Sequence, residues 1–141
     1  DPISSNYDII LVDPPPTLGF FMANTLSAVT EIIIPLQVHA YAYKALDQFI
    51  PVMIEAKEEV NSVLYLSGIV LTLHDRRKNL SRSVAEAVRE RFGELVFETV
   101  VPDNVRIAEA PLEGQAVAEY DPKCKGAIAF RALAKEVLER G

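Results

Sequence analysis

The stretch that most constrains the fold is the apolar run at residues 9–12, which leads directly into Asp13 and three prolines at 14–16. Apolar residues at consecutive positions are typical of a strand that is covered on both faces, as in a parallel sheet. Proline has no backbone N–H to donate, so the expected strand, residues 7–13, must end at the prolines. The sequence therefore predicts a strand that delivers the Asp13 carboxylate to its carboxyl end, where α/β sheets bind ligands.

The carboxylate of Asp13 has two interpretations at this point. One is a loop residue ahead of a proline turn. The other is a Walker B aspartate, because Mg²⁺ is a hard cation that keeps several waters and takes one or two carboxylates together with phosphate oxygens. Stiff prolines after Asp13 would then hold the loop near a γ-phosphate.

Strand and helix patterns alternate along the rest of the chain. Helices are expected over residues 18–29, 42–60, 80–92 and 127–140, strands over 31–37, 64–74 and 96–101, and a loop with a short helix over 103–118. Pro51 predicts a kink or break near residues 49–51, Asn79 or Ser81 is the expected cap of the third helix, and Gly93 its stop. This order predicts an α/β fold, a doubly wound and mostly parallel sheet with helices on both faces.

Composition excludes several classes of protein. The net charge of −6 argues against a generally basic nucleic-acid binder, so any contact with DNA has to be a local patch. Cys124 is the only cysteine, which rules out an internal disulfide and fits a reduced, cytoplasmic setting. No apolar run approaches the ~20 residues of a membrane span. His39 and His74 lack ligand-spaced partners, which argues against zinc.

Residues 13–19, DPPPTLG, resemble the D-x-P-P-[ST]-L-G segment of the ParA/Soj family of chromosome- and plasmid-partitioning ATPases, deviant P-loop ATPases related to MinD. Four further segments resemble successive family segments in the same order: residues 31–37, 71–81, 101–111 and 120–127. The resemblance covers nearly the whole chain. It implies an incomplete P-loop NTPase-like fold, ATP-driven homodimerisation, non-specific DNA binding by the dimer, a ParB-type partner that stimulates hydrolysis, and a nucleoid-associated location without a membrane anchor.

The resemblance also implies roles for residues at the nucleotide. It places Asp13 on Mg²⁺ through an ordered water, with Thr17 and Gly19 in the same loop at lower weight. It places Pro102 and Asn104 against adenine, where a proline ring offers a flat apolar wall and an Asn amide offers both donor and acceptor. An ordinary strand-end turn, where Pro-Asp-Asn is common, is an equally good interpretation of the last two residues.

For DNA, the resemblance points to Arg77 and Arg106, which match positions implicated in non-specific binding. Guanidinium groups pair bidentately with phosphate, and such binding depends steeply on salt. Asp103 stands where the family commonly has a basic residue, and His39 where it commonly has an acidic one. A carboxylate at Asp103 next to Arg106 would weaken the attraction for phosphate. The prediction of DNA binding therefore has less support than the prediction of an ATPase.

The sequence contains no G-x-x-x-x-G-K-[ST], the motif that cradles phosphates, and it begins at Asp1. We therefore expect residues 1–141 to be a single domain, the carboxyl-terminal part of a ParA-type ATPase, and expect this chain alone not to hydrolyse ATP. The alternative is a P-loop-less remnant that acts as a non-enzymatic dimerisation or partner-binding module. A nicotinamide-binding Rossmann domain is excluded, because no G-x-G-x-x-G follows any expected strand.

Overall fold

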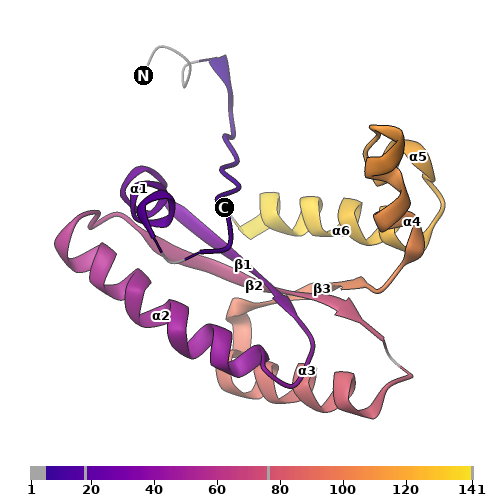
Figure 1. Ribbon diagram of the computed structural model, residues 1–141, viewed down its shortest axis with the longest axis horizontal. Helices are drawn as coiled ribbons and strands as arrows, with labels where there is room; N and C mark the ends of the chain where they lie inside the picture. Colours follow the sequence, from indigo (N-terminus) through magenta and orange to yellow (C-terminus); the bar gives the residue numbers. More distant parts are fainter. Residues whose placement is uncertain (1–5, 18, 76, 141) are drawn as a thin grey trace.

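The computed structural model describes residues 6–17, 19–75 and 77–140. Figure 1 shows them as a small sheet with helices above and below it. In chain order the elements are α1 (Phe20–Ala28), β1 (Glu31–Gln37), α2 (Ala42–Glu59), β2 (Tyr65–His74), α3 (Asn79–Phe92), the 3₁₀ turn η2 (Gly93–Leu95), β3 (Val96–Pro102), α4 (Val105–Glu109), η3 (Ala110–Glu113), α5 (Val117–Tyr120) and α6 (Lys125–Arg140).

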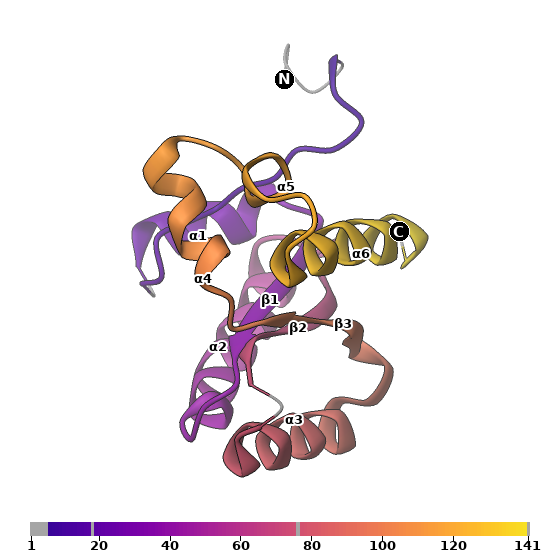
Figure 2. The same cartoon turned by 90° about the vertical axis from the view of Figure 1, so that its right-hand side faces the viewer.

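Within the described residues, three parallel strands form one sheet in the order β1-β2-β3. Helices α2 and α3 cover one face of this sheet, and α4 and α6 cover the other (Figures 1 and 2). The predicted doubly wound α/β architecture is therefore confirmed. It follows from the sequence because parallel strands need crossover connections, and the helices that make those crossovers cover both faces.

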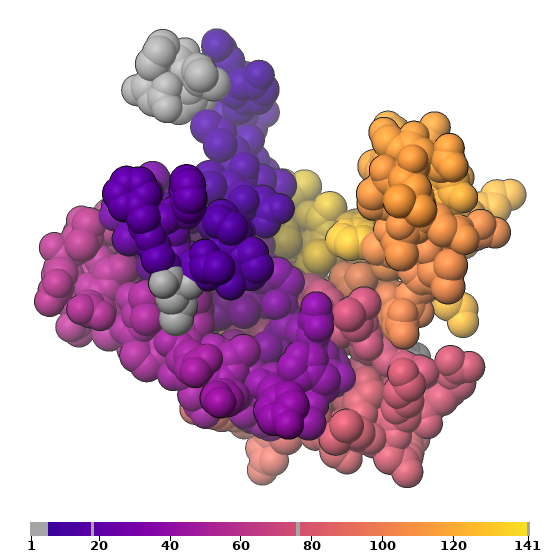
Figure 3. Space-filling view, viewed as in Figure 1, coloured from indigo at the N-terminus to yellow at the C-terminus, as the bar shows by residue number. Residues whose placement is uncertain are grey.

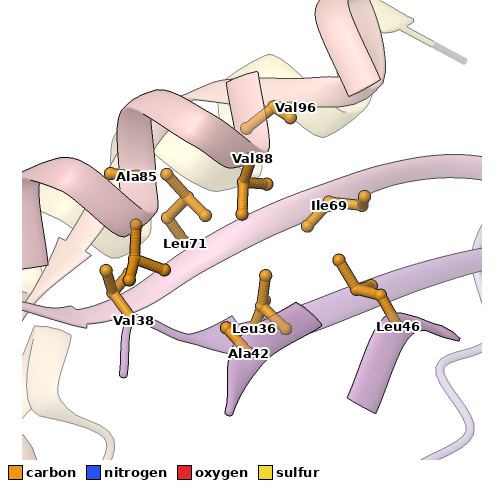
Figure 4. Close-up of a cluster of buried hydrophobic side chains, with 10 residues drawn as sticks. Leu36, Val38, Ala42, Leu46, Ile69, Leu71, Ala85, Val88 and Val96 are labelled. Carbon is orange, nitrogen blue, oxygen red and sulfur yellow. The ribbon is translucent and has the colours of Figure 1, made fainter. Parts of the chain in front are cut away.

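Consecutive residues of the central strand β2 serve two separate cores. Ile69 and Leu71 point toward α2 and α3, while Val70 between them points toward the α6 side. All three are at most 2% exposed, which explains why the central strand is apolar at consecutive positions. Figure 4 shows the first core, in which the three strands, the residue after β1, and helices α2 and α3 meet. Its labelled side chains are Leu36, Val38, Ala42, Leu46, Ile69, Leu71, Ala85, Val88 and Val96.

The expected strand over residues 7–13 is wrong for this structure. These residues pair with no strand in the described part of the chain, and Ile9, Ile10, Leu11 and Val12 are 52–87% exposed. Figures 1 and 3 show the segment rising from the body of the molecule, away from the sheet. The physical reason is that a strand exists only through hydrogen bonds to a neighbouring edge, and no described strand lies beside this segment.

Of the kink or break expected near Pro51, the break is wrong, because α2 is helical without interruption through that residue. An interior proline costs about 3 kcal/mol, through the lost hydrogen bond and the clash with the preceding turn. Ile50 and Met53, on either side of it, pack into the two cores that hold α2 on the sheet. This packing opposes a break.

The boundaries of the other helices agree with the sequence in most places. Leu18, at the expected start of the first helix, lies outside the described residues, and α1 begins at Phe20. Lys78 occupies the N-cap of α3, so neither predicted cap is used. Gly93 ends α3 as predicted, with a φ of 54° that favours glycine. No helix in the described ranges combines the length and the apolar character needed to cross a membrane.

Candidate functional site

The carboxyl edge of the sheet gathers the residues that follow each strand. His74 at the end of β2 lies opposite Pro102 at the end of β3. The backbone N–H of Asp103 donates to the His74 carbonyl over 3.3 Å, and that of Val38 donates to the Thr72 carbonyl over 3.1 Å. The loops after all three strands therefore begin at one edge, the position at which open α/β sheets bind ligands.

Leu73 gives the loop after β2 its direction. Its φ of 52° lies in the left-handed region, which costs a residue with a Cβ about 1–2 kcal/mol. The chain turns there and places Asp75 beside the start of α3, where its N–H donates to the Ser81 hydroxyl oxygen over 3.2 Å. Ser81 is thus a buried anchor for this loop rather than a helix cap.

The Asp75 carboxylate is the most strongly bound acid at this edge. It accepts three hydrogen bonds from Arg77: from the backbone N–H at 3.0 Å, from Nε at 3.0 Å and from Nη2 at 3.1 Å. Lys78 Nζ lies 3.9 Å away. The side-chain hydrogen bond of Arg77, followed by its backbone hydrogen bond, lowers the pKa of Asp75 to about 2. Arg77 itself is 90% exposed but its charge is balanced.

Arg106, the second arginine predicted to bind DNA, is also paired. Its Nη1 lies 2.7 Å from Glu109 Oε2, and its Nε lies 3.5 Å from Asp121 Oδ2. The side-chain hydrogen bond and the charge of Glu109 raise the pKa of Arg106. The sequence suggested Asp103 as the carboxylate that weakens phosphate binding by Arg106. In the structure, the carboxylates that pair with Arg106 are those of Glu109 and Asp121. Contact of Arg77 and Arg106 with DNA stays a prediction.

Pro102 and Asn104 lie at the same edge, as the sequence predicts, but Asn104 has a structural task. Its Oδ1 accepts the backbone N–H of Arg106 over 2.9 Å and so caps α4. This is the strand-end role that the sequence left open. Contact of Pro102 and Asn104 with adenine is not tested by this geometry and stays a prediction.

Asp13 lies in the exposed amino-terminal segment, which is not part of the sheet whose carboxyl edge carries Pro102 and Asn104. It is exposed, and no hydrogen bond or ion pair to it occurs among residues 6–17, 19–75 and 77–140. The loop after it is turned by Thr17, whose N–H donates to the Pro15 carbonyl over 2.7 Å. No cluster of three metal-binding side chains occurs in the described residues. One free carboxylate fits Mg²⁺ only where waters and phosphate oxygens complete the shell.

An open pocket beside α3 was missed by the sequence reasoning. It has a volume of about 380 Å³ and is lined by His74, Arg82, Ala85, Glu86 and Arg89. The four helical residues follow the spacing i, i+3, i+4 and i+7, which places them on one side of α3. That spacing was the available signal, although three of these residues looked like an ordinary solvated face.

The second missed feature is a clamp on the outer edge of β3. Glu136 on α6 accepts the backbone N–H groups of Glu98 and Thr99, each over 2.8 Å, and pairs with Arg140 at 2.8 Å. Burial raises the pKa of Glu136, but the hydrogen bonds from Thr99, Glu98 and Arg140 outweigh it, so the pKa is lowered. Arg140 also lies 4.0 Å above the centre of the Phe97 ring.

Comparison of sequences finds a family described as "AAA domain", which matches residues 1–66. The sporulation initiation inhibitor protein Soj of Bacillus subtilis is 39% identical over 139 residues, which are 99% of this chain and 55% of Soj. The chromosome partitioning protein ParA of Myxococcus xanthus is 40% identical over 139 residues, which are 99% of this chain and 49% of ParA. The chain therefore spans about half the length of the curated relatives it matches.

Solved structures of two proteins share the fold. Cobyrinic acid a,c-diamide synthase of Mycobacterium smegmatis superposes with a TM-score of 0.77 at 30% identity, over 97% of this chain and 49% of the synthase. A second structure of the synthase contains ADP and magnesium. The cell division ATPase MinD of Pyrococcus furiosus superposes with a TM-score of 0.79 at 24% identity, over 99% of this chain and 55% of MinD. At that identity, MinD supports the α/β P-loop NTPase-like fold alone.

Proposed function

This chain belongs to the ParA/Soj family of partitioning ATPases, and from that premise we propose that it is the carboxyl-terminal part of an ATPase that partitions chromosomes or plasmids. The observation that carries the proposal is the relationship to named partitioning proteins at about 40% identity across 99% of the chain. Five motif segments in family order lie within the aligned residues and support it.

The unpaired parts of the sheet support the view that this chain works within a larger domain. In the described part, β1 pairs with β2 alone, so the other edge of β1 leaves its backbone groups without a strand partner. Earlier in the chain, the apolar residues Ile9, Ile10, Leu11 and Val12 are exposed. We infer that a further strand of the complete protein, the one that carries the phosphate-binding loop, pairs between residues 7–13 and β1.

With that strand in place, the nucleotide would lie at the carboxyl edge. Asp13 would hold a water of Mg²⁺, and Pro102 and Asn104 would contact the adenine of ATP. Mg²⁺, when bound, neutralises charge on the β- and γ-phosphates. Asp13 suits this task because no cation in the described structure competes for its carboxylate. Asn104 keeps its amide nitrogen available as a donor while its oxygen caps α4.

ATP-dependent homodimerisation would unite two basic surfaces on DNA, with Arg77 and Arg106 contacting phosphates without reading sequence. Because both arginines are paired with carboxylates, we expect a single chain to bind DNA weakly. A ParB-type partner protein would stimulate hydrolysis, and the dimer would be cytoplasmic and associated with the nucleoid.

Hydrolysis by the complete gene product tests the proposal. We expect Mg²⁺-dependent ATP turnover by the complete protein and none by residues 1–141 alone, measured as released phosphate. A complete protein that neither contains a phosphate-binding loop nor binds ATP would instead be a non-enzymatic dimerisation or partner-binding module.

A further inference from the structure

Two arginines of α3, Arg82 and Arg89, have no close carboxylate partner in the described structure. Arg131 on α6 also lacks one, but its guanidinium donates to two backbone carbonyls. Four arginines have a carboxylate oxygen within 3.0 Å: Arg77, Arg91, Arg106 and Arg140. Arg82 instead donates to the amide oxygen of Asn79. The ion pair of Arg89 is with Glu98, at 3.9 Å, and the Glu98 side chain is 90% exposed. An ion pair of this length with a solvent-exposed partner is weak, so the Arg89 guanidinium remains available to another anion.

Arg82 and Arg89 both line the pocket beside α3. The pocket has a volume of about 380 Å³, and its charged lining consists of these two guanidinium groups, the His74 imidazole and the Glu86 carboxylate. Nearby acids outside the lining are Glu98, beside Arg89, and Asp103, whose N–H donates to His74. Two permanent cations face one carboxylate within the pocket itself, in a chain whose net charge is −6.

Arg89 is held in position for such a role. Its Nη2 donates to the carbonyls of Phe97 at 3.1 Å and Glu98 at 3.3 Å. A guanidinium has five N–H donors, so the remaining groups stay available while the side chain is fixed. Arg82, by contrast, is exposed at the mouth of the pocket.

We propose that this pocket binds the phosphodiester backbone of nucleic acid, as a contact separate from Arg77 and Arg106. The inference rests on the proposed DNA binding of the complete protein. Seven residues separate Arg82 from Arg89, which is about 10 Å along the helix. That separation along the helix leaves room for each guanidinium to take a phosphate of its own on one strand. Guanidinium is also the side chain best shaped for phosphate oxygens.

Opposite charge changes within the pocket test the proposal. The measurement is fluorescence anisotropy of the complete gene product with ATP, Mg²⁺ and a 20-base-pair duplex, about the length of two helical turns, across a salt series. Arg82→Glu should weaken binding about tenfold and reduce the salt slope by about one. Glu86→Gln, which removes the only carboxylate of the lining, should tighten binding several-fold. Lys57→Glu, at the far end of α2 beside α1, is the matched control and should change neither quantity.

The outcomes separate this inference from the proposed function. Unchanged affinity and slope in both pocket variants, while reversal of Arg77 and Arg106 abolishes binding, would overturn the pocket assignment and leave the function standing. A wild-type protein without affinity for the duplex would remove the DNA-binding part of the function as well. If Arg82→Glu weakened direct binding of inorganic pyrophosphate, measured by titration calorimetry without duplex, but left duplex binding unchanged, the pocket would hold small anions and the proposal would be wrong. Circular dichroism of each variant confirms that the fold is retained.

Discussion

The Asp75 carboxylate and the Arg77 guanidinium form a bidentate ion pair at the carboxyl edge of the sheet, with Nε–Oδ1 at 3.0 Å and Nη2–Oδ2 at 3.1 Å. The pair binds an acid that is 13% exposed to a base that is 90% exposed. It fixes the loop between β2 and α3, and it also balances the charge of an arginine that we propose as a DNA contact.

The pair predicts how stability depends on pH. The pKa of Asp75 is lowered to about 2 in the folded chain, below its ordinary value of 3.8. The stabilisation is therefore present above about pH 4 and is lost as pH falls toward 2. Asp75→Asn should lower the melting temperature at pH 6, and the difference from wild type should shrink toward pH 2. A difference that stays constant between pH 6 and pH 2 would contradict the ion pair.

Charge reversal tests the two predicted DNA contacts. Changing Arg77 and Arg106 together to Glu should abolish retention of DNA by the ATP-bound complete protein, because two phosphate-binding groups become repulsive. The measurement is duplex binding at low salt, with Lys57→Glu as the control. Affinity equal to that of wild type would end the assignment of these arginines. The Arg77→Gln and Arg106→Gln pair provides a milder change should the reversal disturb folding.

The clamp on β3 predicts an effect on stability. Glu136→Gln removes a charge that accepts two backbone N–H groups and pairs with Arg140, so it should lower the free energy of unfolding by about 1–3 kcal/mol. Urea denaturation measures this. The matched control is Glu139→Gln, whose carboxylate pairs with exposed Lys135 at 3.5 Å and should matter by less than about 0.5 kcal/mol. Equal effects of the two changes would mean that the clamp does not stabilise the sheet.

Gly68 predicts a second stability effect. A Cβ on this residue would lie 2.8 Å from Phe97 Cδ2 and 2.9 Å from the Leu95 carbonyl oxygen. Gly68→Ala should therefore lower the free energy of unfolding by about 1–3 kcal/mol, because a fully buried ring has to move. Gly19→Ala, where a Cβ meets nothing within 4 Å, should cost less than about 1 kcal/mol. A Gly68 variant as stable as wild type would show that Phe97 moves freely.

Local pattern predicted most of the fold. The strand at β1 was placed to the residue, because consecutive β-branched residues between polar flanks suit a strand covered on both faces. The strand over residues 7–13 has the same pattern and was wrong, since pairing depends on a neighbour that local sequence does not contain. The last helix shows the same limit: Leu133 and Val137 pack on β3, whereas Phe130 and Leu138, which are also apolar, are exposed.

The candidate site was predicted less completely, because its chemistry depends on contacts between loops. The resemblance pointed to Arg77 and Arg106 as contacts with DNA. It gave no sign that Asp121, fifteen residues beyond Arg106, would share the charge of Arg106. The pocket of Arg82 and Arg89 likewise forms only where α3 passes His74. The spacing of Arg82 and Arg89 places them on one side of α3, but tertiary packing decides whether a pocket forms beside that side.

The most direct test of the account is Mg²⁺-dependent ATP hydrolysis by the complete protein carrying Asp13→Ala. The account predicts that turnover is abolished, because the carboxylate that holds a Mg²⁺ water is gone, while the circular dichroism spectrum shows that the fold is retained. Turnover equal to that of wild type would contradict the account, because Mg²⁺ would then be held without the Asp13 carboxylate.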